Sequence, residues 1–191
     1  MKRIAVVGGI GSGKTYAARL FGLPVFNADN EVSKIYKGNK LVHKKLKIKL
    51  PKFIFSFPIK KKQISDAVKS HPKNLNLITN IVHPVVRKNM YKFLKNNKKK
   101  KAVVLDIPLY FENNLNKKND VVIFISTKKK LINKGLKKRN KSNTKLLKKL
   151  EKFQLPLKTK KKKSNYVIIN DFRRKNLIKK IKIIKKEILN G

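Results

Sequence analysis

Residues 5–22, AVVGGIGSGKTYAARLFG, decide the fold of this chain of 191 residues. An apolar run typical of a buried strand leads into a glycine-rich turn, and a helical pattern follows. The phosphate-loop pattern G-x-x-x-x-G-K-[ST] matches Gly8, Gly13, Lys14 and Thr15. The pattern requires a strand before it and a helix after it, and this stretch provides both. The alternative is a glycine-rich turn that binds nothing, but the full pattern rarely arises by chance even in a lysine-rich chain.

The residue types of this loop predict how it binds phosphate. Its glycines allow positive φ and a close approach of the backbone, so that N–H groups and a helix N-terminus can surround an anion. Lys14 can reach the β and γ phosphates, and the Thr15 hydroxyl can bind Mg²⁺. The residues expected to bind ATP here are Gly11, Ser12, Gly13, Lys14, Thr15 and Tyr16. The loop therefore predicts a nucleoside triphosphate with magnesium and leaves the acceptor open.

The composition is strongly basic, with 52 Lys and Arg residues against nine acidic ones and a net charge of +43. Such a surface could bind polyanions, but only six of the basic residues are arginines, the residue expected for base-selective readout. We expect non-specific polyanion binding at most, and solvated loops at the lysine runs 98–101 and 160–163.

The chain has no cysteine, no apolar run of membrane-spanning length and no signal-peptide pattern, which favours a cytoplasmic enzyme without a membrane partner.

Short apolar runs alternate with helical patterns along the chain. The expected strands are 3–7, 24–27, 102–106, 121–125 and 166–169, and the expected helices are 14–21, 28–37, 75–94, 128–138, 144–154 and 172–189. Strand followed by helix, repeated, predicts an α/β fold with a doubly wound parallel sheet of five strands.

Two connections are longer than this alternation requires. The stretch between the second and third strands indicates a helical substrate-binding insertion, because it exceeds one crossover helix. The basic stretch between the fourth and fifth strands indicates a small lid that could close over phosphates. We expect a single kinase unit over 1–191, with a core of 1–30, 100–127 and 164–191, an insertion of about 31–99 and a lid of about 128–163.

Three of the nine acidic residues are candidates for chemistry. Asp29 follows the second strand and Asp106 ends the third, at the edge where open α/β sheets bind their ligands. Asp29 is either the N-cap of the next helix or a base facing the γ-phosphate. Asp106 is either a cap or a magnesium ligand. Glu112 could touch the substrate or neutralise a nearby lysine.

One of the three histidines stands apart, in the segment NIVHPVVRKN. If a helix begins near Pro84, His83 and Arg87 can both face one anion. A histidine packed at the entry of a helix is the alternative.

Taken in order, these segments resemble the dephospho-coenzyme A kinase family over essentially the whole chain. The resemblance rests on GGIGSGKT at 8–15, NAD at 27–29, HPVVR at 83–87, DIPLYFE at 106–112, Arg139 with Gln154 downstream, and NYVIIN at 165–170. It implies a three-layer phosphate-loop kinase fold. It also implies transfer of the γ-phosphate of ATP to the ribose 3′-hydroxyl of dephospho-coenzyme A, the last step of coenzyme A synthesis.

The resemblance implies roles for single residues as well. Asp29 matches the probable catalytic base of the family and is expected to act with Lys14. Arg139 matches a lid arginine that reaches ATP phosphates, and Asn170 matches the segment near the adenine. Thr15 is the expected ligand of Mg²⁺, with Asp106 as a second candidate. The residues expected to bind the substrate are Asp29, Lys61, His83, Arg87 and Glu112.

Three positions depart from the family pattern. Asn27 stands where aspartate is usual, Gly135 replaces a second lid arginine, and Lys61 replaces an arginine, which keeps the charge but loses the bidentate fork. These departures bear on rate and on the lid more than on the reaction. Two alternatives stay open: another phosphate-loop nucleoside or nucleotide kinase, and a basic polyanion-binding protein with a vestigial loop.

Overall fold

The computed structural model describes residues 1–138 and 153–190, in two compact units. The first unit comprises Met1–Asn27 and Asn97–Gly191, and the second comprises Ala28–Asn96. Arg139 and nearly all of the expected helix 144–154 lie outside the described residues.

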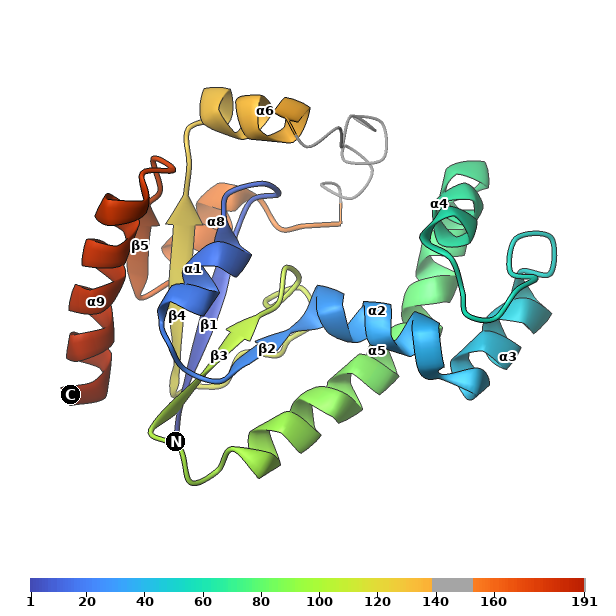
Figure 1. Cartoon of the computed structure of the whole chain (residues 1–191), viewed down its shortest axis with the longest axis horizontal. Coiled ribbons are helices and arrows are strands. Elements are labelled where there is room, and N and C mark those ends of the chain that lie inside the picture. The colour runs from blue at the N-terminus through green and yellow to red at the C-terminus, as the bar shows by residue number, and fades with distance from the viewer. Residues whose placement is uncertain (139–152, 191) are drawn as a thin grey trace. The chain divides into compact units, whose positions relative to one another are not determined.

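A parallel sheet of five strands forms the centre of the first unit (Figure 1). Its strands are β1 (Lys2–Gly8), β2 (Val25–Asn27), β3 (Ala102–Asp106), β4 (Asp120–Ser126) and β5 (Tyr166–Ile169). They lie in the order β2-β3-β1-β4-β5. Each expected strand is present with bounds within one residue of those expected. The predicted α/β fold with a five-stranded parallel sheet is therefore confirmed.

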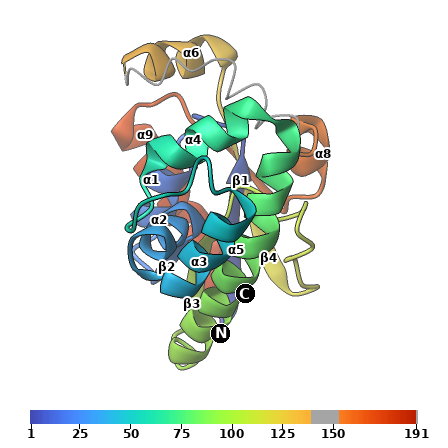
Figure 2. The same cartoon turned by 90° about the vertical axis from the view of Figure 1, so that its right-hand side faces the viewer.

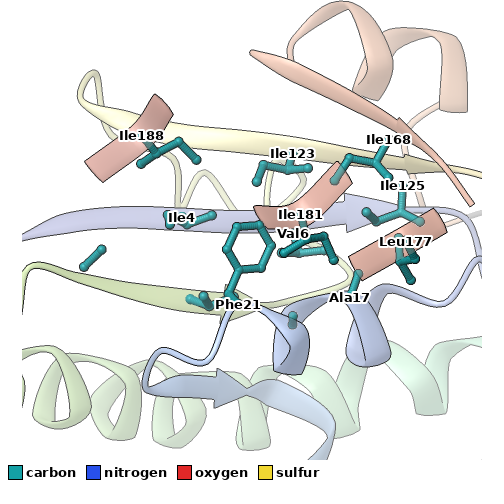
Figure 3. Close-up of a cluster of buried hydrophobic side chains, with 13 residues drawn as sticks. Ile4, Val6, Ala17, Phe21, Ile123, Ile125, Ile168, Leu177, Ile181 and Ile188 are labelled. Carbon is teal, nitrogen blue, oxygen red and sulfur yellow. The ribbon is translucent and has the colours of Figure 1, made fainter. Parts of the chain in front are cut away.

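Helices on the sheet explain why these strands are apolar along their length. The helices of the first unit are α1 (Lys14–Leu20), α6 (Lys129–Lys138), α8 (Leu157–Lys162) and α9 (Arg174–Asn190). Figure 3 shows Phe21, just after α1, and Ile181 of α9 packed with Ile4 of β1 in one buried cluster. All five residues of β3 are buried, as expected of a parallel strand covered on both faces.

Helix α9 has the single buried stripe that its sequence predicts. Leu177, Ile181 and Ile188 are buried, while the lysines between them face outward or lie part-exposed. The helix begins two residues later than expected, at Arg174. Phe172 has a φ of 62°, and a residue in this left-handed region cannot belong to a right-handed helix.

The second unit is built from four helices, α2 (Ala28–Gly38), α3 (Lys40–Lys49), α4 (Lys61–Ser70) and α5 (Pro72–Asn96). The first three pack against the long helix α5, which is light green in Figure 2. The sequence patterns did not predict α3 or α4. Asn39 caps α3 by accepting a hydrogen bond of 2.9 Å from the Val42 N–H.

The helix expected over 75–94 is confirmed as α5, whereas the helix start near Pro84 considered for His83 and Arg87 is not found. Helix α5 begins at Pro72, and Pro84 lies inside it. The first position of a helix needs no N–H partner and suits the fixed φ of proline, so Pro72 is the better start. His83 and Arg87 remain four residues apart on one helix, a spacing that puts them on the same face.

Within residues 1–138 and 153–190, no helix combines the length and the apolar character needed to cross a lipid bilayer.

Candidate functional site

The loop between β1 and α1 lies at the carboxyl edge of the sheet, where neighbouring strands also end. Strand β1 is central and pairs with β3 on one side and β4 on the other. Gly8 is in register with Ile125 of β4, and Val6 with Asp106 of β3. The chain leaves β1 at the point where the strand order reverses, the position at which open α/β sheets bind ligands.

Two glycines of this loop have no room for a side chain. A Cβ on Gly8 would lie 2.5 Å from the Ile125 carbonyl oxygen. A Cβ on Gly13, where φ is +92°, would lie 2.4 Å from Asn170 Nδ2. The glycines are thus required by close contacts with the ends of β4 and β5, in addition to the backbone freedom that the loop needs.

Lys14 and Ser12 turn their polar groups into the loop. Lys14 is buried, and its Nζ donates to the Gly9 carbonyl at 2.7 Å, across the loop. Ser12 is 1% exposed, and its Oγ has no hydrogen-bond partner among the described residues. A buried ammonium and an unsatisfied buried hydroxyl in one loop suit an anionic ligand, because each would gain an acceptor from it. Thr15 and Tyr16 are exposed in the first turn of α1.

Asn170 directly follows β5 and contacts the phosphate loop. It is 2% exposed, its backbone N–H donates to the Ser126 carbonyl at 2.8 Å, and its Nδ2 donates to the Ser12 carbonyl at 2.9 Å. The side chain of this predicted ATP-binding residue is therefore engaged with the loop itself.

Asp106, at the end of β3, is buried and accepts a hydrogen bond from Asn27 Nδ2 through Oδ2. Asn27 ends β2 and is in register with Asp106. In the part of the chain that the structure describes, no group of three or more His, Cys, Asp or Glu side chains could hold a metal ion. A metal that takes most ligands from phosphates and water fits this donor set, since Mg²⁺ commonly uses one or two protein oxygens.

Glu112 contacts a lysine rather than facing open solvent. Its Oε1 lies 2.7 Å from Lys160 Nζ and accepts the Leu155 N–H at 2.7 Å. Lys160 is fully buried and also donates to the Pro108 carbonyl and to Gln154 Oε1, at 3.0 and 3.3 Å. The expected solvated loop at 160–163 is therefore wrong, because α8 includes Lys160 and the carboxylate of Glu112 neutralises its buried charge.

A second buried polar network joins β1 to β4. Arg3 Nε lies 3.0 Å from Asp120 Oδ1, and Arg3 Nη2 donates to the Tyr110 hydroxyl at 3.1 Å. The Tyr110 hydroxyl in turn donates to Asp120 Oδ2. Burial, and then the hydrogen bond to Asp120, raise the pKa of Tyr110 well above its ordinary value.

Four predicted site residues belong to the second unit. Asp29 lies in the first turn of α2, two residues beyond the end of β2, and is exposed. His83 is half-buried and Arg87 is exposed on α5. Lys61 is the exposed first residue of α4.

Sequence patterns missed two polar residues that the structure brings to the site. Thr127 follows β4, and its Oγ1 donates to the Ser12 carbonyl at 3.0 Å. Lys160 supports the loop that follows β3. A threonine just beyond a buried strand was a usable signal for Thr127, whereas Lys160 is hidden among the lysines that surround it.

The sequence is similar to dephospho-CoA kinases over nearly its whole length. A family model described as dephospho-CoA kinase matches residues 3–176. The dephospho-CoA kinase of Fusobacterium nucleatum is 29% identical over 183 residues, which cover 93% of this chain and 94% of that protein.

Two solved structures share the fold. A protein from Thermus thermophilus has a TM-score of 0.79 at 23% identity, covering 97% of both chains. The dephospho-CoA kinase from Campylobacter jejuni has a TM-score of 0.66 at 23% identity, covering 100% of this chain and 98% of that one. At 23% identity, each of these two similarities shows only that the fold is the same.

Proposed function

The chain belongs to the dephospho-CoA kinase family, and from this premise we propose which of its residues carry the reaction. It is a kinase that uses ATP to phosphorylate dephospho-coenzyme A in coenzyme A biosynthesis. The proposal concerns the binding of ATP, the metal, the proton transfer and the binding of the acceptor.

We propose that the loop 8–15 holds the ATP phosphates. The observation that carries this proposal is the buried Lys14 ammonium, which donates to the Gly9 carbonyl beside the unsatisfied Ser12 hydroxyl. Phosphate oxygens are stronger acceptors than a carbonyl, so Lys14 exchanges its partner for the β and γ phosphates when ATP binds. The exposed Tyr16, the lid residue Arg139 and Asn170 complete the set proposed for ATP.

Thr15 and Asp106 are the proposed protein ligands of Mg²⁺. The hydroxyl and the carboxylate are hard oxygen donors, as the ion prefers, and Asn27 orients the Asp106 carboxylate by donating to one of its oxygens. When bound, Mg²⁺ would neutralise part of the negative charge of the ATP phosphates during the transfer.

Asp29 is the proposed general base. The 3′ oxygen of the ribose attacks the γ phosphorus, a new O–P bond forms, and the bond from that phosphorus to the bridging β,γ oxygen breaks, releasing ADP. The proton of the ribose hydroxyl passes to the Asp29 carboxylate. Lys14 balances the charge that develops on the transferring group.

His83, Arg87 and Lys61 are the proposed contacts for the anionic acceptor, which carries a diphosphate between its adenosine and pantetheine parts. All three can donate hydrogen bonds, and the pair on α5 lies one helical turn apart. Glu112 acts indirectly, because it is engaged with Lys160. A cytoplasmic location and non-specific polyanion binding stay predictions from composition and charge.

An acceptor panel tests the proposal. Initial rates of ADP formation are measured with dephospho-coenzyme A, adenosine and AMP, each with Mg²⁺ and with a chelator in excess. The expected result is Mg²⁺-dependent turnover with dephospho-coenzyme A that exceeds the other two by orders of magnitude. Preference for adenosine or AMP would favour a nucleoside or nucleotide kinase. Equal rates with the chelator would remove the metal from the proposal.

A further inference from the structure

The carbonyl oxygen of Ser12 receives two side-chain hydrogen bonds from distant parts of the chain. Thr127 Oγ1 donates at 3.0 Å from the segment after β4, and Asn170 Nδ2 donates at 2.9 Å from the segment after β5. Both donors follow strands that end at the edge of the sheet where the loop lies. Two donors restrict the orientation of a carbonyl more than one donor does.

The direction of this carbonyl determines the direction of the next amide. In a planar trans peptide the carbonyl of Ser12 and the N–H of Gly13 point to opposite sides. The carbonyl points back to Thr127 and Asn170, so the N–H of Gly13 points away from them. A peptide that precedes glycine can flip at little cost, because glycine accepts both signs of φ. This peptide therefore needs external support.

Asn170 is itself oriented by its surroundings. Its Oδ1 accepts the Phe172 N–H at 2.9 Å, which leaves the NH₂ group to face the Ser12 carbonyl. Phe172 itself has an uncommon left-handed φ of 62°. The Nδ2 atom also lies only 2.4 Å from the place that a Cβ on Gly13 would take, so amide and glycine pack closely.

We propose that Thr127 and Asn170 are positioning residues that fix the Ser12–Gly13 peptide with its N–H toward the nucleotide phosphates. The inference rests on the proposed binding of ATP by the loop. A flipped peptide would present the Ser12 carbonyl to the β phosphate, where oxygen would face oxygen. The two side chains stabilise the orientation that attracts an anion and disfavour the one that repels it.

Thr127 offers the cleaner test, because nothing else links it to the reaction. Thr127→Val removes the hydroxyl and keeps the shape, and Thr127→Ser keeps the hydroxyl as a rescue. Ser164→Ala is the matched control, since the Ser164 hydroxyl donates to the Lys160 carbonyl at 2.8 Å and not to a residue of the loop. Calorimetry gives the dissociation constants of MgADP and AMP, and kinetics give KM for ATP and for dephospho-coenzyme A.

The expected result is specific to phosphate. Thr127→Val weakens MgADP binding and raises KM for ATP by about 3- to 10-fold, the value of one hydrogen bond. AMP affinity and KM for dephospho-coenzyme A stay within about twofold, the size of the scatter expected when no hydrogen bond is lost. Thr127→Ser restores MgADP binding, and Ser164→Ala does not change it.

Two results would overturn the inference. One is unchanged MgADP affinity and unchanged KM for ATP in Thr127→Val. The other is an equal loss for AMP and MgADP, or a loss that Ser164→Ala reproduces, which would mark a general effect on the fold. If the parent protein binds no MgADP, the proposed binding of ATP fails instead, and the two failures are thereby distinguished.

Discussion

Lys160 Nζ lies 2.7 Å from Glu112 Oε1, and the lysine side chain is fully buried while that of the glutamate is 12% exposed. The ammonium also donates to the Pro108 carbonyl, in the loop after β3, and to Gln154 Oε1. The pair therefore ties α8 to the segment that follows Asp106. A buried charge that lost its partner would cost far more than an exposed one.

Breaking this pair should destabilise the protein strongly. Glu112→Gln leaves the Lys160 ammonium buried without a counter-charge, so we expect a loss of about 3–5 kcal/mol in the free energy of unfolding. Urea denaturation followed by circular dichroism measures this loss. The double variant Glu112→Leu/Lys160→Met should lose less than the single one, because no buried charge remains.

Lys161→Met is the matched control, since Lys161 is the exposed neighbour of Lys160 on α8. We expect a change of about 0.5 kcal/mol or less there. A loss in Glu112→Gln as small as that of this control would contradict the energetic role of the pair.

The close packing of Gly13 against Asn170 should make that glycine irreplaceable. In Gly13→Ala the new methyl would meet Asn170 Nδ2 at 2.4 Å with φ at +92°, so KM for ATP should rise about tenfold or more. Gly38→Ala is the control, because a Cβ at Gly38 has nothing within 4 Å. Equal KM values in the two variants would argue against the close contact.

The role of Asp29 as a base can be separated from its effect on the first turn of α2. Asp29→Asn keeps size and polarity but cannot accept the proton, so kcat should fall by about 10²- to 10⁴-fold with little change in KM. Glu31→Gln removes a carboxylate from the same first turn of α2 and should keep most of the activity. Rapid-quench kinetics under saturating ATP give kcat for both. Full turnover in Asp29→Asn would end its role as base.

Tyr110 should make the protein sensitive to alkaline pH. Burial and the hydrogen bond to Asp120 raise its pKa in the folded state, so the unfolded chain releases this proton first as pH rises. Stability from this group is complete below the ordinary tyrosine pKa of about 10 and is lost above it. The free energy of unfolding should fall less steeply above that pH in Tyr110→Phe. Parallel pH profiles for parent and variant would contradict this assignment.

The strands and the phosphate loop could be predicted because their signals survive the basic composition. Apolar residues cluster in the buried strands. Gly8, Gly13 and Lys14 have the spacing of the phosphate-loop pattern, which rarely arises by chance even in a lysine-rich chain. The order of strands and helices then leaves few topologies, since parallel crossovers are nearly always right-handed.

Other features could not be read from the sequence for physical reasons. Helices α3 and α4 have lysines at most outward positions and are short, so few buried residues mark them, such as Leu46 in α3 and Ala67 in α4. The burial of Lys160 depends on Glu112, which is 48 positions away along the chain and is brought to it by the sheet. The support of Ser12 by Thr127 likewise arises from the parallel pairing of β1 and β4.

The product of the reaction tests the central claim most directly. After incubation of the protein with Mg²⁺, ATP and dephospho-coenzyme A, phosphorus NMR and mass spectrometry of the purified product locate the transferred phosphoryl group. The expected product carries one new phosphomonoester on the ribose 3′ oxygen and forms in equal amount with ADP. A phosphate at another position, or ADP formed with only free inorganic phosphate, would contradict it.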